Sequence, residues 1–397
     1  MMVYLDHAAT TPMLSAVAAR MSEVQRDPLV GNPSSLHAAG RRARRIVEES
    51  REQVAAAFGA HPSEVLFTSG GTESNNLAIA GLYRARRAAD PVRRRILVSP
   101  VEHHAVLDVV ESLARTEGAE LDWLPIDPAG RVLPEGFAAA LQRDPQGVAL
   151  ATVMTANNEL GTRTAIRELA HLAAEAGVPL HTDAAQAAPV LPIDFGADGA
   201  SAVSITGHKL GGPGGTGILL LRRDVALTPW LHGGGQERGL RSGTLDTAGI
   251  SGLAVAASDA QVQRADRAAR LTALREQLAT GVLVALPDAI RTVGPDVPQL
   301  PGILHLRFPG AEAETLLMLL DRAEVQCSAG AACSAGVTRA SHVLLALGLD
   351  EDAARSGLRF SLGHTSTAAD VAAAVAAVPE AVARARAAAR PSPVGVR

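Results

Sequence analysis

The chain has 397 residues, of which 47% are hydrophobic and 20% charged, and its formal net charge is −4. A chain of this length and apolar content can bury more than one hydrophobic core, so we expect two domains. The small negative charge disfavours a protein that coats nucleic acid or an anionic membrane, because such a surface needs a concentrated positive field. Small molecules and other proteins are therefore the expected partners, with no direct contact to nucleic acid.

Targeting signals and cysteines bear on where the protein works. The N-terminal sequence MMVYLDHAATTP lacks the basic and apolar segments of a secretory signal, and the chain has no uncharged stretch of about 18 apolar residues. Two cysteines, Cys327 and Cys333, are too few for a disulfide framework, and their spacing matches no common zinc site. We therefore expect a cytoplasmic protein that has neither a membrane span nor a metal ion.

The first half of the chain, residues 36–222, alternates helical segments with short runs of β-branched residues. This alternation predicts parallel strands with crossover helices, an α/β fold. Predicted helices lie at 36–58, 105–117 and 165–176, and each ends at a glycine, the usual residue at a helix C-terminus. Predicted strands lie at 65–68, 96–99, 148–154, 179–182, 202–205 and 217–221.

The second half has a different pattern, which begins with a long Ala-rich and charged helical stretch at 248–286. A predicted strand at 303–308 and predicted helices at 311–323 and 341–347 indicate a smaller α+β domain. We therefore expect a large domain at residues 13–258 and a small domain formed by residues 1–12 and 259–397. The Ala/Arg/Pro-rich end, residues 381–397, is expected to fray.

Two glycine-rich motifs point to other activities and fail on their context. Gly212, Gly214 and Gly217 satisfy G-x-G-x-x-G, but a dinucleotide site must open a helix, and these glycines lead into the strand ILLLRR. Residues 232–235 spell the HGGG of some esterase oxyanion loops, but the chain has no G-x-S-x-G sequence to supply the serine. Both motifs are set aside.

Lys209 lies in SITGHKLGGPGG, directly after an apolar strand and directly before a glycine-rich turn. Lysine is one of the few residues that forms a Schiff base with an aldehyde, provided that its site lowers the pKa of the amine. Thr206 and His208 stand beside it in the sequence and can donate hydrogen bonds to a phosphate. The alternative interpretation is an ordinary surface lysine.

A candidate phosphate site lies in TSGGTES, where a predicted strand ends and a helix begins near Thr72. The free N–H groups at such a helix start bind anions, and the Thr72 hydroxyl adds a further donor. The predicted strand breaks at Gly70 and Gly71, directly before this helix. The alternative interpretation is a capped helix that binds no ligand.

A candidate partner for a heterocycle lies in HTDAAQ, where Asp183 ends a predicted strand and Gln186 follows on the same loop. A carboxylate at this place can pair with a protonated pyridine nitrogen and keep the ring an electron sink. Taken alone, an aspartate at a strand end is usually a turn former. Together with the lysine and the phosphate site, it predicts a cofactor that carries an aldehyde, a phosphate and a pyridine ring.

Two further side chains follow predicted strands of the same sheet. His103 in VEHHAV can stack on a pyridine ring and exchange protons near neutral pH, and Asn158 in TANNELG can bond a ring hydroxyl. The neighbouring His104 is interpreted as a helix cap or a surface residue.

Arg359 in GLRFSLGHTS begins an apolar, strand-like run. An arginine is rarely buried there unless it binds an anion, and its planar guanidinium would hold the carboxylate of an amino-acid substrate through two hydrogen bonds. The alternative is an arginine that pairs with a glutamate inside the small domain.

Cys333 lies in QCSAGAACSAGV, where no bulky side chain occurs from Ser328 to Gly336. Such a segment can bring its thiol close to another group. Cys327, at the apolar end of AEVQC, is expected to pack as a small hydrophobic residue. For either cysteine alone, a passive role is the default interpretation.

These segments, in this order, resemble the cysteine desulfurases, members of the class V aminotransferases with the type I pyridoxal-phosphate fold. The likeness runs from Tyr4 to about Ser366 through YLDHAATTP, GNPSS, TSGGTES, EHHAVLD, NNELG, HTDAAQ, TGHKLGGPGG, HGGGQERGLRSGT, SAGAACSAG and RFSLGHTS. It implies a large, mainly parallel α/β domain that binds pyridoxal 5′-phosphate, a smaller α+β domain, and a homodimer.

The resemblance also implies a role for each candidate residue. It implies that Lys209 holds the cofactor, that His103 stacks on its ring, and that Asp183 pairs with the ring nitrogen. Gln186 and Asn158 contact the ring oxygen, and the substrate carboxylate binds Arg359 together with Asn32 or Asn158. The phosphate is held by Gly71, Thr72, Thr206, His208 and, from the second subunit, Thr244.

The implied reaction converts L-cysteine to L-alanine. Lys209 removes the Cα proton, Cys333 attacks the substrate sulfur and becomes a persulfide, and His103 is a proton carrier for a thiol. The SAGAACSAG segment resembles the long-loop branch, which supplies sulfur to iron–sulfur assembly and tRNA thiolation. The chain ends in AARPSPVGVR, which does not resemble that branch's scaffold-docking extension, so a tRNA-thiolating enzyme is the expected main acceptor.

Two rival hypotheses stay open. An aminotransferase or a selenocysteine lyase of the same family would use the cofactor without needing Cys333. A catalytically silent interaction protein would keep only the fold.

Overall fold

The structure is a computed structural model that describes residues 2–330 and 340–389. Its strands are β1 (Val3–Tyr4), β2 (Val65–Thr68), β3 (Arg95–Val98), β4 (Glu120–Trp123), β5 (Val148–Thr152), β6 (Leu180–Asp183), β7 (Ala202–Thr206), β8 (Gly217–Leu221), β9 (Ile290–Arg291), β10 (Ile303–Arg307), β11 (Val325–Gln326) and β12 (Gly357–Ser361). Its α-helices are α1 (Ser15–Arg26), α2 (Ala38–Ala57), α3 (Gly71–Ala89), α4 (His104–Glu117), α5 (Pro134–Gln142), α6 (Ile166–Glu175), α7 (Phe195–Asp198), α8 (Thr247–Ala285), α9 (Ala313–Arg322), α10 (His342–Ala346), α11 (Glu351–Arg355) and α12 (Ala368–Ala389).

The large domain is built on a seven-stranded sheet in the order β2-β8-β7-β6-β5-β3-β4. Neighbouring strands from β7 to β4 are parallel, and β8 runs antiparallel to both β2 and β7. Strands β5, β7 and β8 are buried throughout, which explains why β5 (VALAT) and β8 (GILLL) are nearly continuous apolar runs rather than alternating patterns. The predicted α/β class is confirmed.

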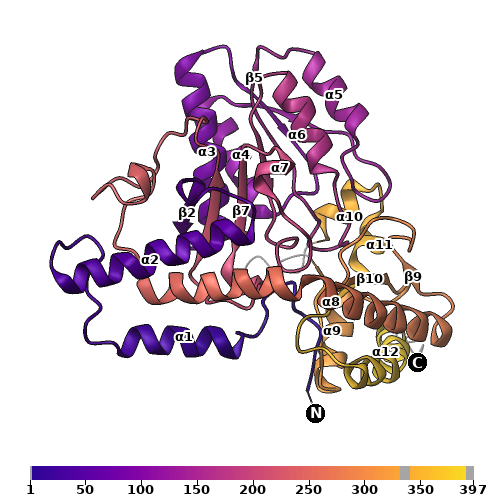
Figure 1. The fold of residues 1–397 in the computed structure, drawn as a ribbon. Coiled ribbons are helices and arrows are strands. Elements are labelled where there is room, and N and C mark those ends of the chain that lie inside the picture. Colours follow the sequence, from indigo (N-terminus) through magenta and orange to yellow (C-terminus); the bar gives the residue numbers. More distant parts are fainter. Residues whose placement is uncertain (1, 331–339, 390–397) are drawn as a thin grey trace, which may run out of the picture.

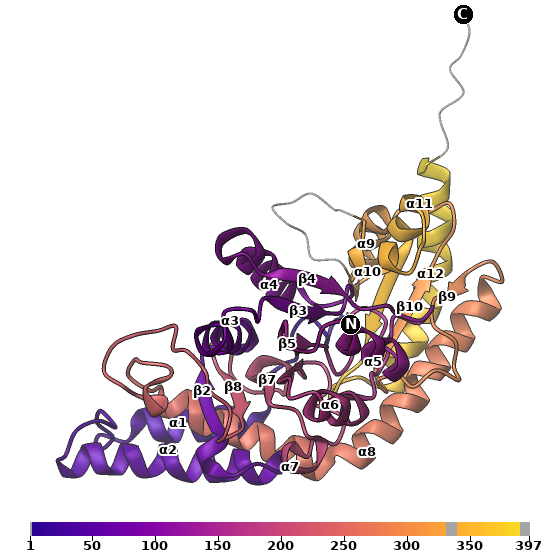
Figure 2. The same ribbon diagram turned by 90° about the horizontal axis from the view of Figure 1, so that it is seen from above.

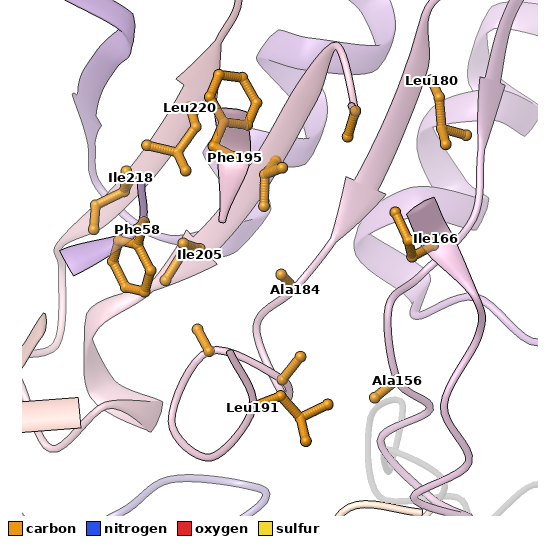
Figure 3. Packing of buried hydrophobic residues seen from close by; sticks show 14 of the residues in the cluster. Phe58, Ala156, Ile166, Leu180, Ala184, Leu191, Phe195, Ile205, Ile218 and Leu220 are labelled. Carbon is orange, nitrogen blue, oxygen red and sulfur yellow. The ribbon is translucent and has the colours of Figure 1, made fainter. Parts of the chain in front are cut away.

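Helices cover both faces of this sheet, because successive side chains of a strand point to opposite sides. Leu66 and Ile96 pack with α3 and α4 in one hydrophobic cluster, whereas Phe67 and Leu97 belong to another cluster on the opposite face. Figure 3 shows members of the second cluster, in which Phe58 and Phe195 face the strand residues Ile205, Ile218 and Leu220.

Glycines end the crossover helices as the sequence predicted. Gly59, Gly118 and Gly177 follow α2, α4 and α6 with φ values of 62°, 70° and 64°. This left-handed conformation is favourable for glycine because it has no Cβ. Each helix therefore stops where the chain must turn back into the next strand of the sheet.

The small domain contains the antiparallel sheet β12-β10-β9 and the parallel pair β1-β11. Val3 and Leu5 from the N-terminus lie in the same hydrophobic cluster as Phe308, Leu320 and Phe360. Helix α12 packs on this cluster through Ala381 and the residues that follow it, so the predicted fraying from residue 381 is wrong for the described part, which is helical to residue 389.

Helix α8 connects the two domains. Its residues up to Ala260 pack in the large-domain core, whereas those from Leu271 onward pack in the small-domain core. Figures 1 and 2 show α8 extending from the side of α1 and α2 to the small domain. We propose to place the domain division within this helix, although Leu300 and Ile303 also join the large-domain core. No helix in the described ranges is long and apolar enough to cross a membrane.

Candidate active site

A cavity of about 320 Å³ lies between the domains, where polar residues from the ends of β5, β6 and β7 meet β12. Cavities of this size accommodate small cofactors and substrates. Its lining includes all the predicted site residues except Asn32, Thr244 and Cys333, namely Gly71, Thr72, His103, Asn158, Asp183, Gln186, Thr206, His208, Lys209 and Arg359.

Lys209 occupies a short turn, Gly207–Lys209, directly after β7. Burial of the amine lowers the pKa of Lys209 to about 8, an effect that the negative charge of Asp183 partly opposes. About half of the amine is therefore neutral near pH 8, and the neutral form predominates above that pH. A neutral lysine amine in a cavity is a nucleophile toward carbonyl carbons and a base toward acidic C–H groups.

The N-terminus of α3 forms one end of the cavity. The helix begins at Gly71, and its N-cap residue, Gly70, provides no side-chain cap for the first N–H groups. A Cβ added to Gly71 would lie 3.3 Å from the Cβ of Thr206, so glycine lets the helix start approach the end of β7 closely. Thr72, Thr206 and His208 line the same region, which makes an anion site from backbone and side-chain donors.

Asp183 is buried at the end of β6, and neighbouring donors fix both of its carboxylate oxygens. Oδ2 accepts a hydrogen bond of 2.7 Å from the Asn75 side chain, and Oδ1 accepts one of 2.8 Å from the Ala185 N–H. Its negative charge opposes the fall in pKa of both His103 and Lys209. The carboxylate is therefore oriented toward the cavity as a partner for a cationic group.

His103 is the N-cap of α4, and its Nδ1 accepts a hydrogen bond of 3.0 Å from the Ala105 N–H. Because Nδ1 is an acceptor, the neutral ring carries its proton on Nε2. Burial lowers the pKa of His103, and Asp183 opposes this shift. The neutral ring therefore donates from Nε2–H, and a further proton binds at Nδ1 in place of the Ala105 hydrogen bond.

Arg359 is buried in β12, with 4% of its surface exposed. Its Nη2 donates to Asp6 Oδ1 at 2.7 Å and its Nη1 donates to the carbonyl oxygen of Asn158 at 3.0 Å. Its Nε is buried and has no hydrogen-bond partner among the described residues. The salt bridge therefore holds the guanidinium in place and leaves its Nε–H for an anion. Its partner is an aspartate rather than the glutamate of the alternative interpretation.

The structure does not bring Asn32 and Thr244 to this cavity. Asn32 is exposed, and its side chain accepts a hydrogen bond from the Ser34 N–H at 2.8 Å. Thr244 is exposed on the connection between β8 and α8, which projects from the β2 side of the large domain (Figure 1). Cys333 lies outside the described residues, but Ser328 and Gly330 before it line the cavity.

Cys327 lies close to Asp6 and Arg359, and burial raises the pKa of its thiol to about 12. Only a thiolate is a strong nucleophile, so Cys327 is inert near neutral pH. The expectation that it packs as a small apolar residue agrees with its contacts, since it lies against the small-domain core.

Several residues of the site were not predicted from the sequence. Asn75 lies one helical turn after Thr72, a spacing that would have placed it on the same face of α3. Asp6 carried no local signal, since its partner Arg359 is 353 positions away. Glu102 is fully buried, accepts a hydrogen bond of 2.6 Å from the Met154 N–H, and has a pKa raised well above its usual value by burial.

Comparisons with known proteins agree on one family. The model of the aminotransferase class-V family matches residues 3–373. The chain is 54% identical to an IscS-like cysteine desulfurase of Mycobacterium tuberculosis (strain ATCC 25618 / H37Rv) over 370 residues, which is 93% of each chain. Among solved structures, a NifS-like protein matches with a TM-score of 0.88 at 32% identity and covers 97% of this chain and 100% of its own. SspA in complex with cysteine matches with a TM-score of 0.78 at 33% identity, covering 92% and 99%.

Proposed function

This chain belongs to the cysteine desulfurases of the class-V aminotransferase family, and we propose that it converts L-cysteine to L-alanine and leaves the sulfur as a persulfide on Cys333. The family depends on pyridoxal 5′-phosphate. The observation that carries the proposal is the buried Lys209 amine, with a pKa of about 8, in one cavity with Asp183 and Arg359.

The residues present fit this cofactor. The α3 N-terminus, Thr72, Thr206 and His208 would hold its phosphate, Asp183 would pair with its ring nitrogen, and the amine of Lys209 would bond its aldehyde carbon. Gln186, whose side-chain amide donates to the Ala8 carbonyl at 2.8 Å, and Asn158 would contact the ring oxygen. When bound, the cofactor supplies an electron sink that makes the substrate Cα–H acidic.

Each step uses a residue of this chain. The free Nε–H of Arg359 binds the substrate carboxylate, and the neutral amine of Lys209 takes the Cα proton. The Cys333 thiolate attacks the substrate sulfur, so an S–S bond forms as the Cβ–S bond breaks. The electron pair of that bond stays on Cβ, which gains a proton to become the methyl group of alanine. His103 would carry protons between these groups by taking one at Nδ1, in place of the hydrogen bond from the Ala105 N–H, and releasing one from Nε2.

A direct test follows alanine and sulfide when the purified protein is incubated with L-cysteine and a thiol reductant. We expect the wild type to form both products in equal amounts, and Lys209→Ala and Cys333→Ser to form neither. Alanine formation by Cys333→Ser at the wild-type rate would overturn the proposal in favour of a lyase or transaminase that does not use this thiol. If the wild-type protein does not bind the cofactor, the hypothesis of a catalytically silent interaction protein is supported instead.

We also propose that the active form is a homodimer in which Thr244 reaches the phosphate of the other subunit. Its exposed place, outside the cavity of its own chain, supports this proposal, as do Trp230 and Leu231, which are 49% and 46% exposed on the same connection. Mixing inactive Lys209→Ala subunits with a Thr244→Trp variant tests it. In mixed dimers, one site combines an intact Lys209 with an intact Thr244, so activity should return; its absence would contradict a shared site.

We propose that the persulfide sulfur passes to an acceptor protein of iron–sulfur cluster assembly or of tRNA thiolation, in the cytoplasm. The names of related proteins, an IscS-like cysteine desulfurase and a NifS cysteine desulfurase, support a place in such sulfur supply. Loading the enzyme with ³⁵S-cysteine and adding each purified acceptor would compare the two routes. If the label stays on the enzyme after either acceptor is added, both proposed routes are contradicted.

A further inference from the structure

The segment that contains Cys333 is held at both ends by described residues. On its N-terminal side, Ser328 and Arg359 exchange two backbone hydrogen bonds, of 3.1 and 2.7 Å. On its C-terminal side, Ser341 is the N-cap of α10, and its side chain accepts from the Leu344 N–H at 3.2 Å.

A single buried carboxyl group, that of Glu159, bonds one end and lies close to the other. The Ser341 hydroxyl donates to Glu159 Oε2 at 2.5 Å. Gly330 has a φ of +84°, and a Cβ added there would lie 3.0 Å from the same oxygen. Both the conformation and the contact therefore favour glycine at this position. Residues 330 and 341 therefore both lie close to one carboxyl group, and the chain between them is outside the described ranges.

Glu159 is itself held rigidly. Its N–H and that of Leu160 donate to Asn157 Oδ1 at 2.9 and 2.8 Å, and the Asn157 amide donates to the Val101 carbonyl at 2.9 Å. The carbonyl of the residue before it, Asn158, accepts from Arg359. The same turn thus fixes the guanidinium and the carboxyl group relative to each other.

Burying this carboxyl group is costly. Glu159 is 1% exposed, and burial raises its pKa, while the Ser341 hydrogen bond and the charges of Arg359 and His104 oppose the rise. A buried polar group of this kind is tolerated when its hydrogen bonds are made, and it then specifies one arrangement of the segments that bond it.

We infer that Glu159 is a positioning residue for sulfur transfer, which fixes both ends of the Cys333 segment relative to the arginine that binds the substrate. The inference rests on the proposed function, since it requires Cys333 to be the sulfur acceptor. Because Ser341 and Gly330 flank this segment, a change at Glu159 alters the positions at which the segment begins and ends, and small misplacements of a reacting group have large effects on rate.

The test separates sulfur transfer from the chemistry at Cα. Glu159→Ala and Ser341→Ala are expected to slow single-turnover alanine formation by about tenfold or more, because misplacement of a reacting group by about 1 Å has effects of this order. Exchange of the L-alanine Cα–H in D₂O needs Lys209 but no thiol, so it should stay within about twofold of the wild type. Glu159→Gln, which still accepts from Ser341, should be milder than Glu159→Ala.

Ser251→Ala is the matched control, because Ser251 is also a buried serine but donates to the Ala248 carbonyl within α8. A second readout needs no turnover. A nitroxide attached to Cys333 in a Cys327→Ala background should give a less restricted spectrum in Ser341→Ala and Glu159→Ala, and an unchanged one in Ser251→Ala.

The outcomes are distinct. If Cys333→Ser still forms alanine, the proposed function fails and the inference fails with it. If Cys333→Ser is inactive while Ser341→Ala and Glu159→Ala keep wild-type transfer, only the inference is overturned. It is also overturned if Cα exchange falls in parallel with alanine formation, since the defect would then be a general loss of structure. Should Glu159→Ala fail to fold, Ser341→Ala decides alone.

Discussion

The two walls of the cavity are held in different ways. On the large-domain wall, the partners of Asp183 and His103 include N–H groups two residues along the chain, at Ala185 and Ala105. On the small-domain wall, Arg359 is held by Asp6, 353 positions away, and Ser341 bonds Glu159, 182 positions away. The first wall is therefore held partly by contacts within single strand ends, beside the bond from Asn75 to Asp183, whereas the contacts cited for the second wall all join distant parts of the chain.

The largest effect is expected on the first wall, from Asp183→Asn. This change keeps the shape but removes the charge that would pair with the ring nitrogen, and loss of one such electrostatic partner costs about 10²- to 10³-fold in turnover. Steady-state alanine formation measures it. Asp194→Asn, which removes the charge of a carboxylate that caps α7, is the control. A loss below about tenfold would contradict the role of Asp183.

On the second wall, Arg359→Ala should lower kcat/KM for L-cysteine by about 10- to 100-fold, the range for loss of a hydrogen bond to a charged group. Arg359→Lys keeps the charge but not the planar fork and should recover only part of the loss. Because the change leaves Asp6 without its partner, thermal unfolding should be measured beside the kinetics. An unchanged kcat/KM would exclude the arginine from substrate binding.

The pH dependence of cofactor uptake by the apoprotein tests how the first wall tunes Lys209. Only the neutral amine reacts, so the uptake rate should rise through a midpoint near the pKa of about 8 and level off above it. Asp183 opposes the fall in that pKa, so Asp183→Asn should move the midpoint to lower pH. A midpoint that moves upward would mean that the two groups do not interact as the structure indicates.

The smallest effect is expected from Cys327→Ala. The thiol has a pKa of about 12 and lies against the small-domain core, so alanine formation should stay within about twofold of the wild type. Alkylation by iodoacetamide at pH 7, followed by peptide mass analysis, should modify Cys333 and spare Cys327. Loss of persulfide formation in Cys327→Ala would instead place this cysteine in the path of sulfur.

This contrast explains what the sequence could predict. Strand-end motifs such as TSGGTES and HTDAAQ can be recognised from a few neighbouring residues. Their meeting at one site can also be predicted, because parallel strands bring their carboxyl ends to one edge of the sheet. Asp6 and Glu159 gave no such signal, since neither a capping pattern nor a turn reveals a partner that is distant in the sequence. Helix α12 continues to residue 389 for a similar reason, because burial against the small-domain core outweighs the weak local signal of its last turns.

The pairing of β1 with β11 bears on how the protein is made. Val3 is synthesised long before its strand partner Val325, and Asp6 long before its partner Arg359. Domains generally fold as they are synthesised, beginning with the N-terminal one, so the large sheet can form early while the substrate pocket stays unfinished. A nascent chain can thus form the wall that contains Lys209 and Asp183 before Arg359, the proposed cysteine-binding residue, has been made.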